Sequence, residues 1–216
     1  MSVHPSNFGA PVDEALIAEI NKKYANRVLQ DVGLCICVFD LVEAGEGKVR
    51  YGDGLLWYKV VFRIVVFRPF ASEVLIAKVK SSDEDGIRLT VGFFDDMYIP
   101  AAYLPQPSAF DSNERAYFWL PGSELTTSTE LLDTPVAERM YIDQGEVLRV
   151  RMEAEEFYDD EPGPPRMSEG VQVTREAQRA PYNVVCSIAE QGLGPVAWWN
   201  GATVVEEGQE EVMDEG

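Results

Sequence analysis

The chain has 216 residues, and its 18 Lys and Arg side chains are outnumbered by 37 Asp and Glu side chains, which gives a formal net charge of −19. Hydrophobic residues make up 46% of the chain, enough to form a folded core. The excess of acid argues against general binding of polyanions, because affinity for phosphates comes mainly from Lys and Arg. The single histidine, His4, rules out a histidine-based catalytic triad and a metal site built on several histidines.

The cysteine count and the apolar runs indicate where such a chain would work. Three cysteines, an odd number, predict reduced thiols rather than a disulfide framework. The longest apolar run, residues 55–67, contains Lys59 and Arg63 and is too short and too charged to cross a bilayer. We therefore expect a soluble intracellular protein with no membrane contact, no bound metal and no cofactor.

The first 69 residues predict a helix followed by strands. Residues 11–28 carry an apolar side chain at every fourth position, with a proline and acids at the start and cations near the end, as is typical of an amphipathic helix. Residues 34–41 have the composition of a buried strand. Residues 57–68 alternate, with apolar side chains on both faces, which favours a central strand. Pro69 ends that strand and predicts a domain boundary between residues 69 and 70.

Two short motifs in this region have ordinary explanations. Cys35 and Cys37 would share one face of a strand, because side chains alternate with a period of two, but a zinc site would need two further ligands. The glycines between residues 45 and 54 lack the lysine of a phosphate-binding loop. They therefore predict turns rather than a nucleotide site.

The remainder of the chain predicts a small β-barrel. Five strand-like segments are separated by turn signals, a spacing that suits an OB-fold; they are residues 73–81, 86–92, 96–100, 146–157 and 182–190. We expect this domain to span residues 70–205, with loop insertions near residues 105–135 and 159–181. Residues 206–216 contain six acids and no base, and so predict an acidic, solvated tail.

A local excess of cations stands out against the acidic background. Residues 59–88 hold six Lys and Arg but only four Asp and Glu. Aromatic rings beside cations on a small barrel are what single-stranded nucleic acid needs, because the rings stack on bases and the cations neutralise phosphates. The candidate RNA-binding residues are Lys78, Lys80, Arg88, Phe94 and Tyr98. The alternative is that Phe93 or Phe94 belongs to the barrel core and that the cations form a solvated edge.

The acidic residues of the same region do not predict an active site. Residues 83–86, Asp-Glu-Asp-Gly, have a composition typical of a turn between strands. Asp95 and Asp96 enter a strand after an aromatic pair, so a carboxylate metal site or an acid–base pair is the weaker interpretation. We expect neither a catalytic residue nor a metal ligand in this chain.

Several longer motifs carry a resemblance to a known family that covers most of the chain. They are residues 19–27, 32–37, 52–54, 65–70, 92–100 and 192–199. Together they resemble the larger stalk subunit of eukaryotic RNA polymerase III, in a family shared with the stalk subunit of polymerase II and with their archaeal counterpart. The Phe-Phe-Asp-Asp run at residues 93–96 and the closing pair Trp198-Trp199 favour the polymerase III branch.

The resemblance implies a non-catalytic polymerase subunit of two domains. The first would be an α+β domain of truncated RNP-like topology, with a helix on an antiparallel sheet, and would dock on the polymerase core. The second would be an all-β OB-fold barrel. Gly52, Asp53 and Gly54 match the family's tip region and are therefore the candidate core-docking residues. The family opens with an extended strand that residues 1–9 do not resemble. We therefore expect an N-terminally shortened chain: either the sequence starts late, or its N-terminal sheet lacks this strand.

The resemblance also implies partners and a location. A smaller helical stalk subunit would form a heterodimer with this chain on the RNA polymerase III core, in the nucleus. The pair would support transcription initiation on small non-coding RNA genes and contact nascent RNA. The alternative function is a stand-alone OB-fold factor that binds single-stranded RNA.

Overall fold

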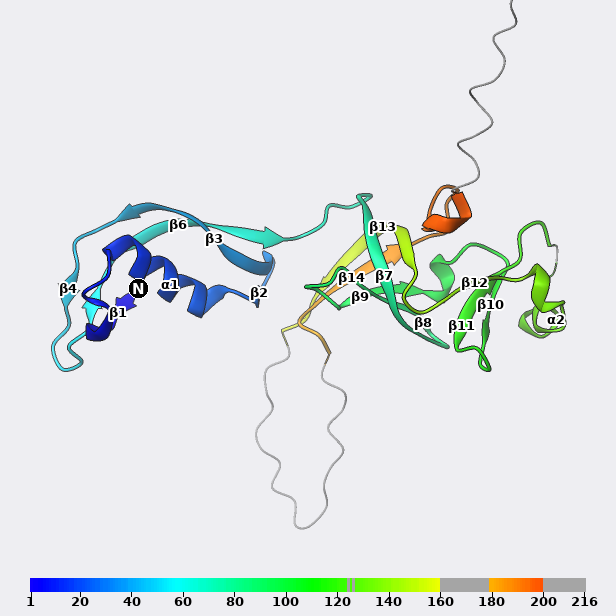
Figure 1. The fold of residues 1–216 in the computed structure, drawn as a ribbon, viewed down its shortest axis with the longest axis horizontal. Coiled ribbons are helices and arrows are strands. Elements are labelled where there is room, and N and C mark those ends of the chain that lie inside the picture. Colours follow the sequence, from blue (N-terminus) through cyan, green and yellow to red (C-terminus); the bar gives the residue numbers. More distant parts are fainter. Residues whose placement is uncertain (124, 126, 160–178, 200–216) are drawn as a thin grey trace, which may run out of the picture. The chain divides into compact units, whose positions relative to one another are not determined.

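The structure is a computed structural model that describes residues 1–123, 125, 127–159 and 179–199 (Figure 1). The chain divides into two compact units: Met1–Pro69 with Phe157–Tyr182, and Phe70–Glu156 with Asn183–Gly216. Most of the predicted insertion at residues 159–181 lies outside the described residues, and so does the whole predicted tail at residues 206–216.

The N-terminal unit packs one helix against short antiparallel sheets (Figure 1). Its elements, with η for a 3-10 helix, are β1 (Ser2–Val3), η1 (Pro5–Asn7), α1 (Val12–Tyr24), β2 (Arg27–Leu29), β3 (Gly33–Ala44), β4 (Lys48–Val49), β5 (Leu56–Trp57) and β6 (Val60–Phe67). One sheet has the order β2-β3-β6 and another has the order β1-β5-β4. Leu16 and Ile20 of α1 are fully buried, and Asn21 accepts a hydrogen bond from the Val38 amide of β3 (2.8 Å). The helix therefore covers one face of the β2-β3-β6 sheet.

The helix is shorter than its apolar pattern predicts. α1 ends at Tyr24 because Ala25 is extended and Asn26 takes a φ of +57°. The Asn26 amide donates to the Cys35 carbonyl (2.8 Å), and Arg27–Leu29 then pair with β3 as a strand. Val28, the last apolar position of the predicted stripe, thus belongs to β2. A single apolar residue fits the period of a strand as well as that of a helix.

Two further expectations for this unit are wrong. A first strand is present: Ser2–Val3 pairs with β5, and Met1 and Tyr58 exchange two backbone hydrogen bonds of 2.8 Å. β6 lies at an edge of its sheet, and β3 is the central strand. The apolar residues on both faces of β6 therefore do not indicate two buried faces; one face packs towards α1 and the other is exposed.

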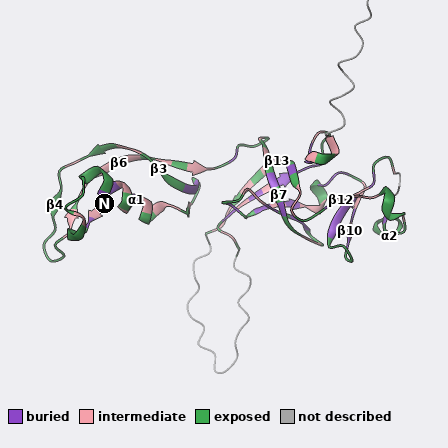
Figure 2. Cartoon of the chain, viewed as in Figure 1, coloured by how far each residue is buried: buried purple, intermediate pink, exposed green. Residues whose placement is uncertain are grey.

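The C-terminal unit contains a five-stranded barrel made of β7 (Val74–Asp83), β8 (Gly86–Thr90), β9 (Met97–Pro100), β13 (Val147–Phe157) and β14 (Tyr182–Ser187). β7 pairs with β8, β8 with β9, β9 with β14 in parallel, β14 with β13, and β13 with β7, which closes the sheet. The side chains inside it are buried, whereas β3 of the other unit is largely exposed (Figure 2). An α+β domain followed by an OB-like barrel is thus confirmed. A short β15 (Gly194–Pro195) also pairs with β13 and leads into η4 (Val196–Trp199).

The segment between β9 and β13 is a small folded layer, where the sequence predicted a loop insertion. It contains η2 (Ala101–Tyr103), β10 (Ser108–Asp111), β11 (Ala116–Trp119), α2 (Ser128–Leu132), η3 (Val136–Glu138) and β12 (Met140–Ile142). The three strands form one sheet in the order β10-β11-β12. This layer has its own core, in which Ala109, Phe118, Leu120 and Leu131 pack together.

A buried ion pair joins the helix of this layer to its sheet. Arg139 Nη1 and Asp111 Oδ2 are 3.0 Å apart, and each side chain is only 7% exposed. Arg139 Nη2 also donates to the carbonyls of Leu132 (2.6 Å) and Thr134 (2.8 Å) at the end of α2. The Tyr141 hydroxyl donates to Asp111 Oδ2 (2.9 Å). One arginine therefore holds α2, β10 and β12 in a fixed arrangement.

The stability of this layer is expected to fall in acid. Burial alone would raise the pKa of Asp111, but hydrogen bonds from Tyr141 and two backbone amides, together with the charge of Arg139, leave that pKa below its ordinary value. A carboxyl group with a depressed pKa stabilises the fold above its unfolded pKa of about 3.9 and loses that contribution as pH falls through the folded pKa.

Urea unfolding followed by tryptophan fluorescence, at a series of pH values, measures this effect. The wild-type chain should lose free energy of unfolding below about pH 4 faster than Asp111→Asn does, because the variant lacks the titrating group. Parallel loss in both proteins would show that Asp111 does not supply the acid sensitivity.

Candidate functional site

The loop between β4 and β5 is organised around Asp53. Its Oδ1 accepts a hydrogen bond from the Leu55 amide (3.0 Å), and its Oδ2 accepts one from the Trp57 indole (3.3 Å). Gly52 (φ +101°) and Gly54 (φ +67°) flank it in the left-handed region that side chains disfavour. The three candidate core-docking residues therefore lie together in one turn, whose conformation is held by these hydrogen bonds and backbone angles. We call residues 50–55 the tip loop.

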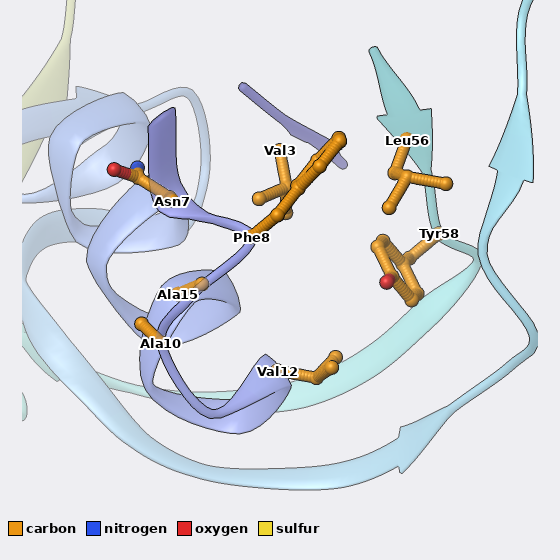
Figure 3. A pocket seen from close by; sticks show the side chains of 8 residues that line it. All are labelled: Val3, Asn7, Phe8, Ala10, Val12, Ala15, Leu56 and Tyr58. Atoms are coloured by element: carbon orange, nitrogen blue, oxygen red, sulfur yellow. The ribbon is translucent and has the colours of Figure 1, made fainter. Parts of the chain in front are cut away.

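An apolar pocket of about 160 Å³ lies beside the end of the tip loop (Figure 3). Val3 of β1, Leu56 of β5 and Tyr58 form one side of it. Phe8, which precedes α1, and Val12, the first residue of α1, also line the pocket. Phe8 and Val12 are each about half exposed, so the pocket reaches the surface. Sequence reasoning missed this pocket, because its lining comes from two segments, residues 3–15 and 56–58, that are far apart in the chain.

The face of the β2-β3-β6 sheet that points away from α1 is apolar and exposed. Three register shifts against β6 each insert one extra residue in β3, and the inserted residues are Ile36, Phe39 and Val42. All three are exposed, as are Val61 and Val65 of β6. We call these five residues the outer sheet face. A contiguous exposed apolar surface of this kind is typical of a protein interaction site.

Phe39 lies at the middle of the outer sheet face and is 66% exposed. The Arg63 guanidinium lies over its ring, 5.0 Å from the centroid, and also pairs with Asp40 (Nε to Oδ1, 2.8 Å). Hydrogen bonds from Arg63 hold the pKa of Asp40 below its ordinary value. The charges on this face are thus paired with each other, so its chemistry is dominated by the apolar residues.

The first bulge also separates the two neighbouring cysteines. Cys35 is buried and Cys37 is exposed, so the prediction that they share one face is wrong. The extra residue Ile36 changes the alternation between them. Burial raises the pKa of the Cys35 thiol.

The candidate RNA-binding residues do not form one basic surface. Lys80 Nζ pairs with Asp95 (2.7 Å), and Arg88 Nε lies 3.4 Å from Asp83. These two cations are therefore already neutralised by neighbouring carboxylates. Lys78, by contrast, makes no ion pair within the part of the chain that the structure describes.

One of the two aromatic candidates lies in the barrel core. Phe94 is 4% exposed, so it belongs to the barrel core and cannot stack on a base, whereas its neighbour Phe93 is 57% exposed. Tyr98 lies opposite Arg88 in the β8–β9 ladder, and its hydroxyl approaches Gly86 so closely that an added Cβ there would lie 2.7 Å away. Burial, and then the charges of the adjacent acidic turn, raise the pKa of Tyr98.

The adjacent acids Asp95 and Asp96 have ordinary structural roles. Hydrogen bonds from Lys80 and Thr90 lower the pKa of Asp95, while burial and the neighbouring charge of Asp95 raise that of Asp96. These contacts account for both directions without a catalytic role. Within the described ranges, no group of three or more His, Cys, Asp or Glu side chains is placed to hold a metal ion. Neither α-helix that the structure describes has the length and apolar character needed to cross a membrane.

A cation that sequence reasoning missed lies next to Lys78. Register pairs Lys78 of β7 with Val147 of β13 and pairs Ile76 with Arg149, so the two cations lie diagonally on the outside of the barrel. Arg149 is exposed and, among the described residues, has no ion-pair partner. About 70 residues separate the two positions, and only the β7–β13 pairing could have predicted their proximity.

Comparison with known proteins identifies the family. The model described as RNA polymerase III subunit Rpc25 matches residues 73–199, more than half of the chain. The chain belongs to the Rpc25 family. A second model, the SHS2 domain found in the N terminus of Rpb7p, Rpc25p and MJ0397, matches residues 1–54. This Rpc25 family member therefore carries an SHS2 domain ahead of its barrel.

Full-length relatives agree with the Rpc25 assignment. The DNA-directed RNA polymerase III subunit rpc8 of Schizosaccharomyces pombe is 43% identical over 201 residues, which cover 92% of this chain and 95% of that protein. The subunit RPC8 of Bos taurus is 38% identical and covers 93% and 94% of the two chains. The RNA polymerase II subunit RPB7 of Saccharomyces cerevisiae is 27% identical over 54% of this chain and 70% of that protein.

The Rpc25 assignment confirms the resemblance that the sequence motifs carry. The predicted relation to the polymerase II subunit and to the archaeal subunits is confirmed as well. One archaeal relative, Rpo7 of Saccharolobus shibatae, is 27% identical over 44% of this chain and 53% of that protein. This Rpc25 family member is a non-catalytic subunit of an RNA polymerase III, as its sequence predicts.

Proposed function

We propose that this chain is the larger subunit of the polymerase III stalk and that it attaches to the polymerase core through its tip loop. The observation that carries the proposal is the shape of that loop. Asp53 and two glycines in the left-handed region hold a turn on which Tyr51 is fully exposed. The adjacent pocket could receive an apolar side chain of the core. In the nucleus, such a stalk would support initiation on small non-coding RNA genes.

Valine at both glycines of the tip loop is expected to weaken attachment to the core. A β-branched residue with a positive φ costs about 1–2 kcal/mol, so Gly52→Val with Gly54→Val should distort the turn. Neither position has an atom within 4 Å of an added Cβ, so the change should not disturb packing. Co-purification of core subunits with the tagged variant should fall at least tenfold.

Gly122→Val supplies the matched control for the tip-loop variant. Gly122 also has a positive φ (+75°) and open space around it, but it lies in the inserted layer of the other unit. The control should therefore retain the core subunits. Equal loss of the core in both variants, or in neither, would contradict attachment through the tip loop.

A second part of the proposal is that the smaller helical stalk subunit covers the outer sheet face. That face consists of five exposed apolar side chains. Arg63, which lies over the ring of Phe39, is paired with Asp40. An amphipathic helix has the complementary apolar stripe and needs no matching charge at its centre. The pairing would remove this apolar surface from water.

Any contact with nascent RNA is expected to be weak and to depend on Lys78 rather than Lys80. Lys78→Glu should lower the salt dependence of single-stranded RNA binding by about one phosphate contact. Lys80→Glu should change it less, because Asp95 already neutralises Lys80. Fluorescence anisotropy of an RNA oligonucleotide at several salt concentrations distinguishes the two. Equal slopes for both variants would argue against this assignment.

The same contacts weaken the alternative of a stand-alone RNA-binding factor. Such a factor needs several free cations and exposed rings on one face. Here Lys80 and Arg88 are paired with carboxylates and Phe94 is buried. The described barrel surface therefore supports a subunit that is held in place by protein contacts.

A further inference from the structure

The outside of the β7–β13 ladder combines exposed aliphatic side chains with two cations that have no ion-pair partner among the described residues. Val74, Ile76 and Lys78 project from β7, and Val147 and Arg149 project from β13. We call these five residues the ladder patch. Their neighbours in each strand, such as Ala77 and Leu148, are buried inside the barrel, as the alternation of a strand requires.

The composition of the ladder patch indicates the chemistry of its ligand. Val74, Ile76 and Val147 are each about half exposed, and none of the five residues is aromatic. The patch therefore lacks the rings on which bases stack. Lys78 and Arg149 are without an ion pair in the described part of the chain, whereas Arg151, next along β13, already contacts Glu153 and Glu190. An acidic peptide with aliphatic side chains would satisfy both features.

The chain itself carries such a peptide. Residues 206–216 contain six acidic side chains and no cation, and aliphatic side chains precede the acids at Val204 and Val205 and lie among them at Val212 and Met213. This segment follows the last described residue, Trp199, in the same unit as the barrel.

The described segment that leads to the tail starts next to Arg149. β15 pairs with β13 so that Gly194 lies opposite Arg149. The following turn is held by two contacts: the Trp199 indole donates to the Leu193 carbonyl (2.8 Å), and the Trp198 ring packs against Trp119 with 5.2 Å between centroids. Neighbouring strands are about 4.8 Å apart, and six extended residues span about 20 Å, so residues 200–205 are long enough for the acids to reach the patch.

We propose that the acidic C-terminal tail, residues 206–216, binds the ladder patch of its own barrel through Lys78 and Arg149. The short connection keeps the tail at a local concentration in the millimolar range, so even a weak contact is populated. A tail held there competes with any other anionic ligand for the same two cations. The contact lies within one chain and does not depend on assembly with the polymerase.

Zero-length carbodiimide cross-linking of the purified full-length chain tests the contact. The reagent joins a carboxylate to a lysine amine only where the two touch, and mass spectrometry locates the link. Lys78 should give the main link to residues 206–216, and the lysines of the N-terminal unit, such as Lys48 and Lys59, should give at least fivefold less. In 0.5 M salt the link should fall severalfold, because the Debye length drops to about 4 Å.

Two variants separate attraction from proximity. Arg149→Glu keeps the Lys78 amine but changes the formal charge of these two positions from +2 to 0, so the link at Lys78 should fall at least threefold. Arg115→Glu makes the same charge change at an exposed site in the same unit and should leave the link unchanged. Equal yields in wild type and Arg149→Glu would overturn the proposal. So would links mainly between chains in a mixture of heavy- and light-isotope protein, because the occupant would then be a second copy.

Discussion

Arg139→Ala is expected to be strongly destabilising, with a loss of about 3–5 kcal/mol in the free energy of unfolding of the C-terminal unit. The substitution leaves the Asp111 carboxylate buried without its cation and leaves two carbonyls at the end of α2 without their donor. The Arg139 side chain also packs over Phe118, 4.8 Å from its ring centroid, so that contact is lost as well. Chemical denaturation followed by tryptophan fluorescence measures the change.

A double variant and an exposed control show whether burial causes the loss. Arg139→Met combined with Asp111→Leu should recover much of the stability, because no charge is then left unpaired in the interior. Arg63→Ala breaks an ion pair with Asp40 that lies on the surface, and should cost far less. If all three variants were equally unstable, the buried pair could not be the element that holds the inserted layer.

Phe39→Asp is expected to abolish association with the smaller stalk subunit. Phe39 is the largest of the five side chains on the outer sheet face, and large aromatic residues near the middle of an interface carry much of its binding energy. A carboxylate in its place would be desolvated in the complex without a partner, so affinity should fall at least a hundredfold. Isothermal titration of the purified chains, or their co-purification after co-expression, measures the loss.

Val136→Asp is the matched control for Phe39→Asp. Val136 is 65% exposed, which is close to the value for Phe39, but it lies in η3 of the inserted layer. The same carboxylate there should leave association unchanged. Retained association by Phe39→Asp, with its fold intact by circular dichroism, would show that the partner binds elsewhere.

The barrel could be predicted from sequence because its strands alternate clearly and are separated by turn residues. Val74–Asp83, Gly86–Thr90 and Met97–Pro100 lie close to the predicted bounds. The closure of the barrel, with the parallel β9–β14 pair, depends on pairings between distant segments. Local patterns predict the strands and a small barrel, whereas the prediction that an α+β domain precedes that barrel rests on the motifs that carry the family resemblance.

The details of the candidate surfaces could not be predicted, for physical reasons that differ from site to site. The outer sheet face depends on three bulges, which local apolar patterns do not reveal. The choice between Phe93 and Phe94 depends on the backbone turn before β9, because both residues are equally apolar. The loss of Lys80 as a free cation depends on a contact with Asp95, 15 residues away.

Among the described residues, the acidic side chains pair with some of the cations and not with others. The acids of the barrel neutralise Lys80 and Arg88, and they leave Lys78 and Arg149 on the ladder patch without an ion pair in the described part of the chain. A chain with a net charge of −19 therefore still has a local site for an acidic segment.

Affinity purification of the tagged chain from nuclear extract, with quantitative mass spectrometry of the co-purifying proteins, decides whether this chain works as a polymerase III stalk subunit. We expect the polymerase III core subunits and one small helical protein to be recovered in fixed, equimolar proportion to the tagged chain. Recovery of the chain alone, or with RNA-binding factors and without polymerase III subunits, would rule out the proposed function.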